Sequence, residues 1–274
     1  MRLVSPQVVL FPETTKYFVL PQDKEIWNNV MTLRGLLETF VEERRQQIKD
    51  GTASDFGDLL AILLTDDLFK NNNKMIIDEC LTFFFAATQT SSMSTQNMLF
   101  YMTQQPKYRE RVREEIQTQI IDKLESKDEL KQKGLENVLD FENIAHLKFY
   151  SSCFMESLRI EPPVMYSSPC CLTEDQYIGK YHILKGEQIQ MDMTFLHRNR
   201  EQWQRPDEYL PDRFDPEHPL FLTPSGKKRH GMSFGPFLGG KRICLGKTFV
   251  ETMSKIISPT LIHNFNFEFI DPKH

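Results

Sequence analysis

A cysteine in a glycine-rich loop near the C-terminus constrains this chain more than any other feature. The fixed positions of the loop follow the spacing F-x-x-G-x-R-x-C-x-G and are Phe237, Gly240, Arg242, Cys244 and Gly246. Gly240 and Gly246 allow close backbone approach, because glycine has no Cβ and tolerates unusual dihedral angles. A thiolate that binds iron needs such a rigid loop, with hydrogen-bond donors near the sulfur. The loop therefore predicts an iron–thiolate site at Cys244; the alternative is a buried structural cysteine beside a turn.

Length and composition limit the remaining classes of protein. The 274 residues suffice for one large domain or two small ones, and 40% of them are hydrophobic, which is enough for a substantial core. We expect a single domain over residues 1–274. The net charge of −5 shows no general basicity, so nucleic acid is not expected as a partner. Five cysteines without disulfide-framework or zinc spacing indicate a reducing, intracellular compartment.

Hydrophobic periodicity predicts a mainly α fold with small β-sheets. Helical spacing covers residues 23–49, 74–104, 107–124, 141–160 and 245–258. Ser54 and Asp55 are candidate caps of a further short helix, and Pro259 is expected to end the last helix. Short strands are predicted between residues 170 and 193, an aperiodic loop over 197–231, and a closing strand over 265–270. The first ten residues are too short and interrupted for a signal peptide or a spanning helix.

A second motif pairs Glu156 with Arg159 late in the 141–160 helix. The i, i+3 spacing places both on one helix face, within reach of an ion pair. Such pairs are common and contribute little when exposed, so the spacing alone is weak evidence. Arg213 follows in the sequence Pro-Asp-Arg-Phe, inside the aperiodic loop. A buried carboxylate bound by two guanidinium groups could hold such a loop against the core.

A third motif lies in the 74–104 helix and reads Ala-Ala-Thr-Gln-Thr-Ser over residues 86–91. With the three motifs in this order, the chain resembles the cytochrome P-450 family, the haem-thiolate monooxygenases, over about residues 20–270. The resemblance implies that Cys244 ligates the iron of haem b, that Arg242 meets a haem propionate, and that Phe237 covers the proximal face. It also implies that Glu156, Arg159 and Arg213 form a buried network with a structural role.

The resemblance implies a reaction as well. One oxygen atom from O2 would be inserted into a hydrophobic small molecule, with electrons from a separate flavoprotein reductase, and NADPH would act only indirectly through that reductase. The cations Lys227, Lys228, Arg229 and Lys241 are a candidate docking surface for the reductase, although an ordinary solvated loop is an equal alternative. Family members are longer, so we expect an N-terminally truncated, C-terminal portion, located at the endoplasmic reticulum membrane if an anchor precedes it.

The motif over residues 86–91 departs from the family pattern at a position that matters for the mechanism. Thr90 matches the family's proton-relay threonine, whereas Gln89 replaces the usual acid. An amide can bind water but cannot relay a proton by ionising. Oxygen activation would then be slower or differently coupled, or the site would rearrange a hydroperoxide without reductase. A non-catalytic fragment is the remaining alternative.

Overall fold

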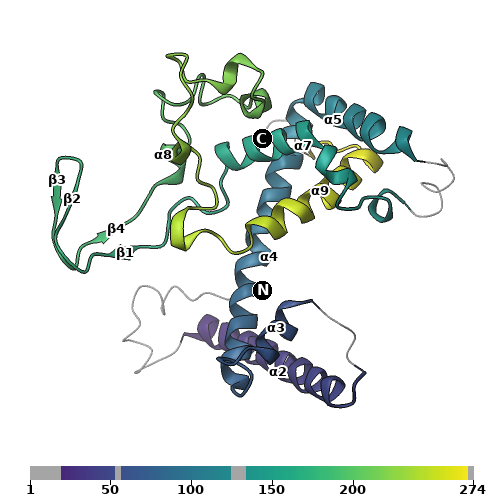
Figure 1. Cartoon of the computed structure of the whole chain (residues 1–274), viewed down its shortest axis with the longest axis vertical. Coiled ribbons are helices and arrows are strands. Elements are labelled where there is room, and N and C mark those ends of the chain that lie inside the picture. The colour runs from purple at the N-terminus through teal and green to yellow at the C-terminus, as the bar shows by residue number, and fades with distance from the viewer. Residues whose placement is uncertain (1–19, 53–56, 125–133, 271–274) are drawn as a thin grey trace. The chain divides into compact units, whose positions relative to one another are not determined.

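The structure is a computed structural model that describes residues 20–52, 57–124 and 134–270 (Figure 1). The described residues are mainly helical with small antiparallel sheets, which confirms the predicted fold class. Contacts divide the chain into two compact units, Met1–Thr88 and Gln89–His274, and each has its own hydrophobic cluster. The expected single domain over residues 1–274 stays a prediction. No helix in the described ranges combines the length and apolar character needed to cross a membrane.

The first unit consists of α2 (Pro21–Lys49), α3 (Leu59–Thr65) and the beginning of α4 (Asn73–Gln104). Its core contains Val41, Leu63, Leu64, Ile76 and Ile77. Asp58 caps α3, since its carboxylate accepts a 2.8 Å hydrogen bond from the N–H of Ala61. The predicted caps Ser54 and Asp55 lie outside the described residues.

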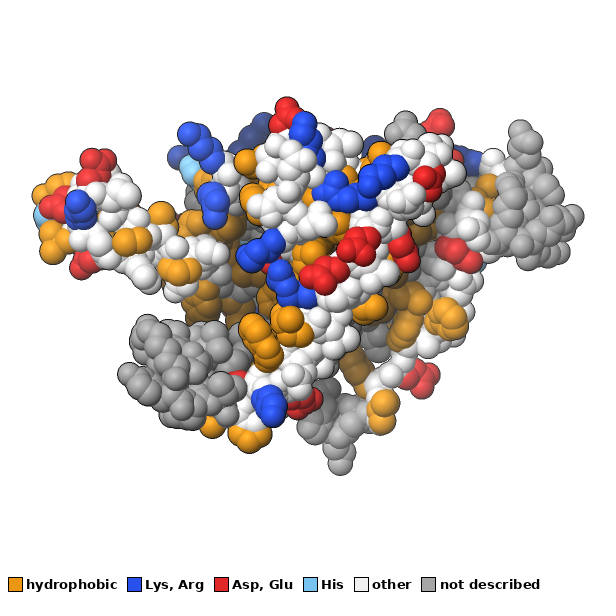
Figure 2. Space-filling view, turned by 90° about the horizontal axis from the view of Figure 1, so that it is seen from below, with side chains coloured by type: hydrophobic (Ala, Val, Ile, Leu, Met, Phe, Trp, Pro, Cys, Tyr) orange, Lys and Arg blue, Asp and Glu red, His pale blue; other side chains and the backbone are white. Residues whose placement is uncertain are grey.

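The second unit contains both sheets. β1 (Cys170–Cys171) pairs antiparallel with β4 (Gln188–Ile189), and β2 (Gln176–Ile178) pairs antiparallel with β3 (Tyr181–Ile183). Gly179 has φ +60° in the two-residue turn between β2 and β3, a conformation that favours glycine. The β2–β3 hairpin leaves Tyr177, Ile178 and Tyr181 exposed, and hydrophobic side chains also reach the surface elsewhere (orange in Figure 2). The strands predicted between residues 170 and 193 are therefore present but bury little surface.

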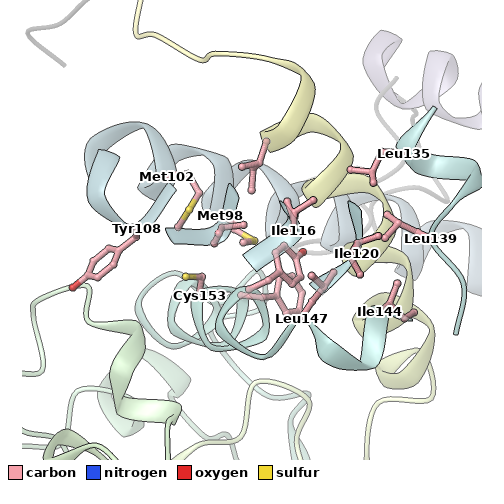
Figure 3. Close-up of a cluster of buried hydrophobic side chains, with 14 of the residues drawn as sticks. Met98, Met102, Tyr108, Ile116, Ile120, Leu135, Leu139, Ile144, Leu147 and Cys153 are labelled. Carbon is pink, nitrogen blue, oxygen red and sulfur yellow. The ribbon is translucent and has the colours of Figure 1, made fainter. Parts of the chain in front are cut away.

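The core of the second unit lies among four helices: the rest of α4, α5 (Pro106–Gln119), α7 (Lys148–Ile160) and α9 (Lys247–Asn264). Its side chains include Met98 from α4, Ile116 from α5 and Cys153 from α7 (Figure 3). Tyr150 of α7 donates a buried 2.7 Å hydrogen bond to the carbonyl of Ser254 in α9. Hydrophobic burial and this bond together hold α7 against α9.

The helix predicted over residues 141–160 is divided in two. A 3₁₀ turn covers Asn143–His146, and α7 begins at Lys148. The carboxylate of Glu115 in α5 accepts hydrogen bonds of 2.7 and 2.8 Å from the N–H groups of Phe149 and Tyr150. Burial raises the pKa of Glu115, although these backbone donors oppose the shift. A side chain from another helix therefore sets where α7 begins.

Two predictions near the C-terminus are wrong. Pro259 does not end the last helix, since α9 continues to Asn264 with Pro259 buried inside it. Residues 265–270 form no strand. Arg113 of α5 donates hydrogen bonds of 2.9 Å to the carbonyls of Ile262 and Phe265, so a side chain binds the backbone that a neighbouring strand would have paired. Tertiary contacts thus override the local signals for a helix stop and a strand.

The remaining elements are short and lie mostly in the connections. α8 covers Met193–Leu196. Further 3₁₀ turns are Ile121–Lys123, Leu135–Asn137, Pro211–Phe214, Pro219–Phe221, Gly231–Ser233 and Gly240–Arg242. Four of these turns fall after residue 210, in the segment between the sheets and α9, where the sequence has no periodicity.

Candidate functional site

Glu156, Arg159 and Arg213 meet in the interior of the second unit, each with no exposed side-chain surface. Arg159 donates from Nε to Oε2 of Glu156 over 2.7 Å and from Nη2 to Oε1 over 2.9 Å, which is a two-pronged pair. Arg213 donates from Nε to the same Oε1 over 3.0 Å. The backbone N–H of Leu210 adds a 2.7 Å hydrogen bond to Oε1. One buried carboxylate thus binds two guanidinium groups and a loop amide.

The same guanidinium groups bind backbone carbonyls of the aperiodic loop. Nη1 of Arg159 donates to the carbonyls of His197 and Pro206 over 2.9 and 2.7 Å. Arg213 donates to the carbonyls of Gln204 and Arg205. Buried carbonyl groups need hydrogen-bond donors, and this loop contains only short 3₁₀ turns to supply them. The arginines therefore keep the predicted loop ordered without periodic structure.

Arg229 belongs to this network and is half-buried, unlike the exposed lysines of the predicted docking surface. Its Nη2 donates a 2.7 Å hydrogen bond to the carbonyl of Arg213, and its Nη1 donates one of 3.0 Å to the carbonyl of Leu220. The guanidinium lies 4.4 Å from the ring centre of the buried Trp203. Burial and the charge of Arg213 lower the pKa of Arg229 to about 10. Lys227, Lys228 and Lys241 are exposed, as predicted for a surface patch.

His197 lies at the end of α8, fully buried between the network and the cysteine loop. Its Nε2 accepts a 3.1 Å hydrogen bond from the N–H of Gly235, and its ring centre lies 5.2 Å from that of Phe234. Burial lowers the pKa of His197 to about 4, and the charges of Arg159 and Arg198 contribute to the shift. The imidazole is therefore neutral at pH 7 and acts as a hydrogen-bond acceptor.

The cysteine loop turns back on itself before α9 begins. The N–H of Leu238 donates to the carbonyl of Gly235 over 2.9 Å, and the N–H of Cys244 donates to the carbonyl of Phe237 over 2.8 Å. Gly240 has φ +62°, which explains why glycine suits the position. These bonds fold the segment from Phe237 to Cys244 into a compact loop that contains the 3₁₀ turn Gly240–Arg242. α9 begins after it, at Lys247.

The surroundings of Cys244 fit a planar apolar cofactor that carries acidic groups. The Cys244 side chain is exposed, and the neighbouring Ile243, Leu245 and Phe249 are exposed hydrophobic residues, with Leu245 at 80%. A Cβ at Gly246 would lie 3.9 Å from the Cys244 sulfur, which is an ordinary van der Waals distance, so the sulfur is not crowded on this side. Arg242 is exposed and remains available for an anionic group.

Gln89 and Thr90 lie on α4, a different element from the cysteine loop. Gln89 is exposed and Thr90 is half-buried. The hydroxyl of Ser94 donates a 2.8 Å hydrogen bond to the carbonyl of Thr90, one turn earlier in the helix. The structure thus brings Glu156, Arg159 and Arg213 into contact. The five motif positions from Phe237 to Gly246 lie in one loop that ends where α9 begins, whereas Gln89 and Thr90 lie on α4.

Sequence comparison agrees with the combination of exposed cysteine, glycine turn and buried Glu/Arg/Arg network. The family model for cytochrome P450 matches residues 2–274. The chain belongs to the cytochrome P450 family. This assignment confirms the resemblance expected from the three motifs.

Several curated cytochrome P450 relatives match most of this chain. It is 29% identical over 214 residues to human cytochrome P450 4F12, covering 78% of this chain and 37% of the relative. It is 32% identical over 254 residues to a cytokinin hydroxylase of Arabidopsis thaliana, covering 89% of this chain and 45% of the relative. Human cytochrome P450 4F11 is 27% identical over 271 residues, covering 94% and 48% respectively. The chain spans less than half the length of these relatives.

Sequence reasoning missed the roles of Arg229, Trp203 and His197. Arg229 stands beside Lys227 and Lys228 in a polar segment, so its charge predicted exposure. One sequence signal could have predicted the buried position of Arg229: the aperiodic loop contains Trp203 as well as arginines. Buried aromatic faces attract guanidinium groups.

Proposed function

We propose that this cytochrome P450 chain carries the haem-thiolate centre of a monooxygenase, which inserts one atom of O2 into a hydrophobic small molecule. The observation that carries the proposal is the exposed Cys244 thiol, at the end of a loop whose backbone bonds lead directly into α9. A negatively charged sulfur there lies beside the N-terminal end of α9, where the helix dipole favours negative charge. Membership of the family gives the loop its expected cofactor.

The residues that would hold haem b are those of the loop. Cys244 would supply the thiolate ligand, Arg242 would meet a propionate, and Phe237 would shield one face of the ring. Gly240 and Gly246 would leave room for close approach. When bound, haem supplies the activation of O2, and a thiolate ligand promotes O–O cleavage by donating electron density.

Two side chains of α4, Thr90 and Gln89, would take part in proton delivery. The Thr90 hydroxyl can accept and donate a hydrogen bond at once, so it can pass a proton from water. The Gln89 amide can orient water, but it does not ionise near neutral pH. We therefore infer that proton delivery relies on Thr90 and water, and that Gln89 makes it slower than a carboxylate would.

Electrons would come from a flavoprotein reductase, with NADPH acting only through that partner. Lys227, Lys228 and Lys241 are exposed and cationic, which suits an acidic partner surface. The five cysteines are free thiols, in keeping with an intracellular, reducing compartment. Gln89 favours one second candidate, a hydroperoxide isomerase, because such a rearrangement needs neither external protons nor reductase.

The deciding experiment is the reduced, carbon-monoxide-bound absorption spectrum of the expressed chain with haem supplied. A thiolate-type Soret band in the wild type and in Cys170→Ser, together with its loss in Cys244→Ser, supports the proposal. Cys170 is the matched control because it is also an exposed, free cysteine. A soluble, folded wild type without this band refutes haem-thiolate function for this chain and leaves a non-catalytic fragment. Turnover of a hydroperoxide without reductase would select the isomerase.

A further inference from the structure

His197 touches both the buried Glu/Arg/Arg network and the cysteine loop. Its carbonyl accepts a 2.9 Å hydrogen bond from Nη1 of Arg159. Its Nε2 accepts a 3.1 Å hydrogen bond from the N–H of Gly235, which precedes Phe237 by two residues. The side chain has no exposed surface. A single residue therefore connects the network with the segment that leads to Cys244.

The bond from Gly235 determines which nitrogen of the imidazole carries the proton. Nε2 is the acceptor, so the neutral ring must carry its proton on Nδ1. Nδ1 is buried, and the backbone of Arg159 acts on the imidazole as a hydrogen-bond partner that opposes the lowering of its pKa. The contact that the imidazole supplies to the cysteine loop is the bond from Gly235.

We propose that His197 is a positioning residue of the Cys244 site, which it serves by accepting the Gly235 hydrogen bond. Beyond Gly235 the connection runs through the loop itself. The Gly235 carbonyl accepts from Leu238 over 2.9 Å, and the Phe237 carbonyl accepts from Cys244 over 2.8 Å. Without the imidazole acceptor, residues 234–238 lose this hydrogen bond to the network and keep the ring contacts of Phe234 with Trp203 and Phe214. The backbone that orients Cys244 then becomes less rigid. The consequence for cofactor binding rests on the proposed function, whereas the loop geometry does not.

A variant pair separates this role from simple packing. His197→Gln keeps an acceptor oxygen near the position of Nε2, and His197→Met has nearly the same shape without that oxygen. Both lose the ring, so a difference between them reports the acceptor. His218→Met is the matched control, because Nδ1 of His218 accepts a 3.2 Å hydrogen bond from the N–H of Leu220 in a separate turn.

The first measurement is amide hydrogen exchange at Gly235 in the haem-free full chain. We expect His197→Met to accelerate this exchange about tenfold or more, the size of effect that follows from losing one buried hydrogen bond, while His197→Gln stays within about threefold of the wild type. His218→Met should leave it unchanged. Equal exchange in the Gln and Met variants overturns the proposal. If His197→Met does not fold, His197→Phe takes its place, since it keeps a ring beside Phe234 and lacks the acceptor.

The second measurement is the thiolate-type fraction of the reduced, carbon-monoxide-bound spectrum after haem is supplied. We expect His197→Met to lower that fraction and His197→Gln to restore most of it. A wild type that binds no haem would refute the proposed function, and Gly235 exchange would still decide the role of His197. A normal spectrum in His197→Met, despite faster exchange at Gly235, would overturn the link from the loop to Cys244.

Discussion

Nε of Arg213 lies 3.0 Å from Oε1 of Glu156, across 57 residues of sequence, and neither side chain has any exposed surface. Removing two charges from water is costly unless each finds close partners. Here the carboxylate also binds Arg159, and both guanidinium groups also bind loop carbonyls. The arrangement therefore holds a long loop to α7 through charges and backbone groups that satisfy each other.

Substitution of Glu156 by Gln should leave two buried guanidinium groups without their counter-charge. We expect the free energy of unfolding to fall by about 3–5 kcal/mol, the usual effect of breaking a buried pair. Urea unfolding at pH 7 measures the change. Glu208→Gln is the control, because the Glu208 side chain pairs with Arg205 while both are about half exposed, and such pairs contribute at most about 1 kcal/mol. Equal losses in the two variants would contradict the structural role of Glu156.

His197 should make the protein less stable in mild acid. Its pKa is about 4 when folded and 6.5 as an ordinary histidine, and the charged groups acting on it are Arg159 and Arg198. Between pH 6.5 and 4 the unfolded chain binds a proton that the folded chain refuses, so the free energy of unfolding falls as the pH falls. The loss approaches about 3 kcal/mol below pH 4, at 1.36 kcal/mol per pKa unit.

The measurement compares urea unfolding of the wild type and His197→Gln from pH 7 to pH 4. Carboxylates titrate in both proteins, so their contribution cancels in the difference. We expect the stability of the wild type relative to His197→Gln to decline over this interval. A difference that stays constant with pH would show that His197 is not held neutral by the fold.

Arg229→Met should destabilise the protein, because Arg229 is half-buried and hydrogen-bonded, whereas the neighbouring Lys227 and Lys228 are exposed. The variant loses hydrogen bonds to the carbonyls of Arg213 and Leu220 but relieves repulsion from Arg213. We expect a net loss of about 1–2 kcal/mol by urea unfolding. Lys228→Met, at the adjacent exposed position, should change stability by no more than about 0.5 kcal/mol. If Lys228→Met costs as much as Arg229→Met, the inward role of Arg229 is wrong.

Gln89→Glu should increase proton supply if the proposed monooxygenase reaction takes place. A carboxyl group near Thr90 can release and take up a proton, and a positioned acid–base group contributes about 10²–10⁴-fold to a step that it controls. We expect turnover to rise about tenfold and peroxide release to fall, measured with reductase and a hydrophobic substrate. Gln96→Glu supplies the control, as another exposed glutamine on α4. Unchanged turnover and peroxide release in Gln89→Glu would show that position 89 does not limit the supply of protons.

Features set by neighbouring residues were predictable. The 74–104 pattern gave α4 to within one residue, and the i, i+3 spacing placed Glu156 and Arg159 together on α7. Predictions failed where a distant group intervened. Glu115 of α5 decides where α7 begins, and Arg113 binds the backbone of the segment expected to be a strand. Local periodicity contains no information about such donors and acceptors.

The motif around Cys244 is local, because its glycines, its arginine and its sulfur lie within ten residues, and the family assignment needs little more. Contacts between distant segments settle the rest: Arg213 joins Glu156, Arg229 turns inward to Trp203, and His197 reaches Gly235. Charge alone predicts exposure for Arg213 and Arg229. Desolvation is offset only when a fold brings carboxylates, carbonyls and aromatic faces around them, which no short pattern in the sequence encodes.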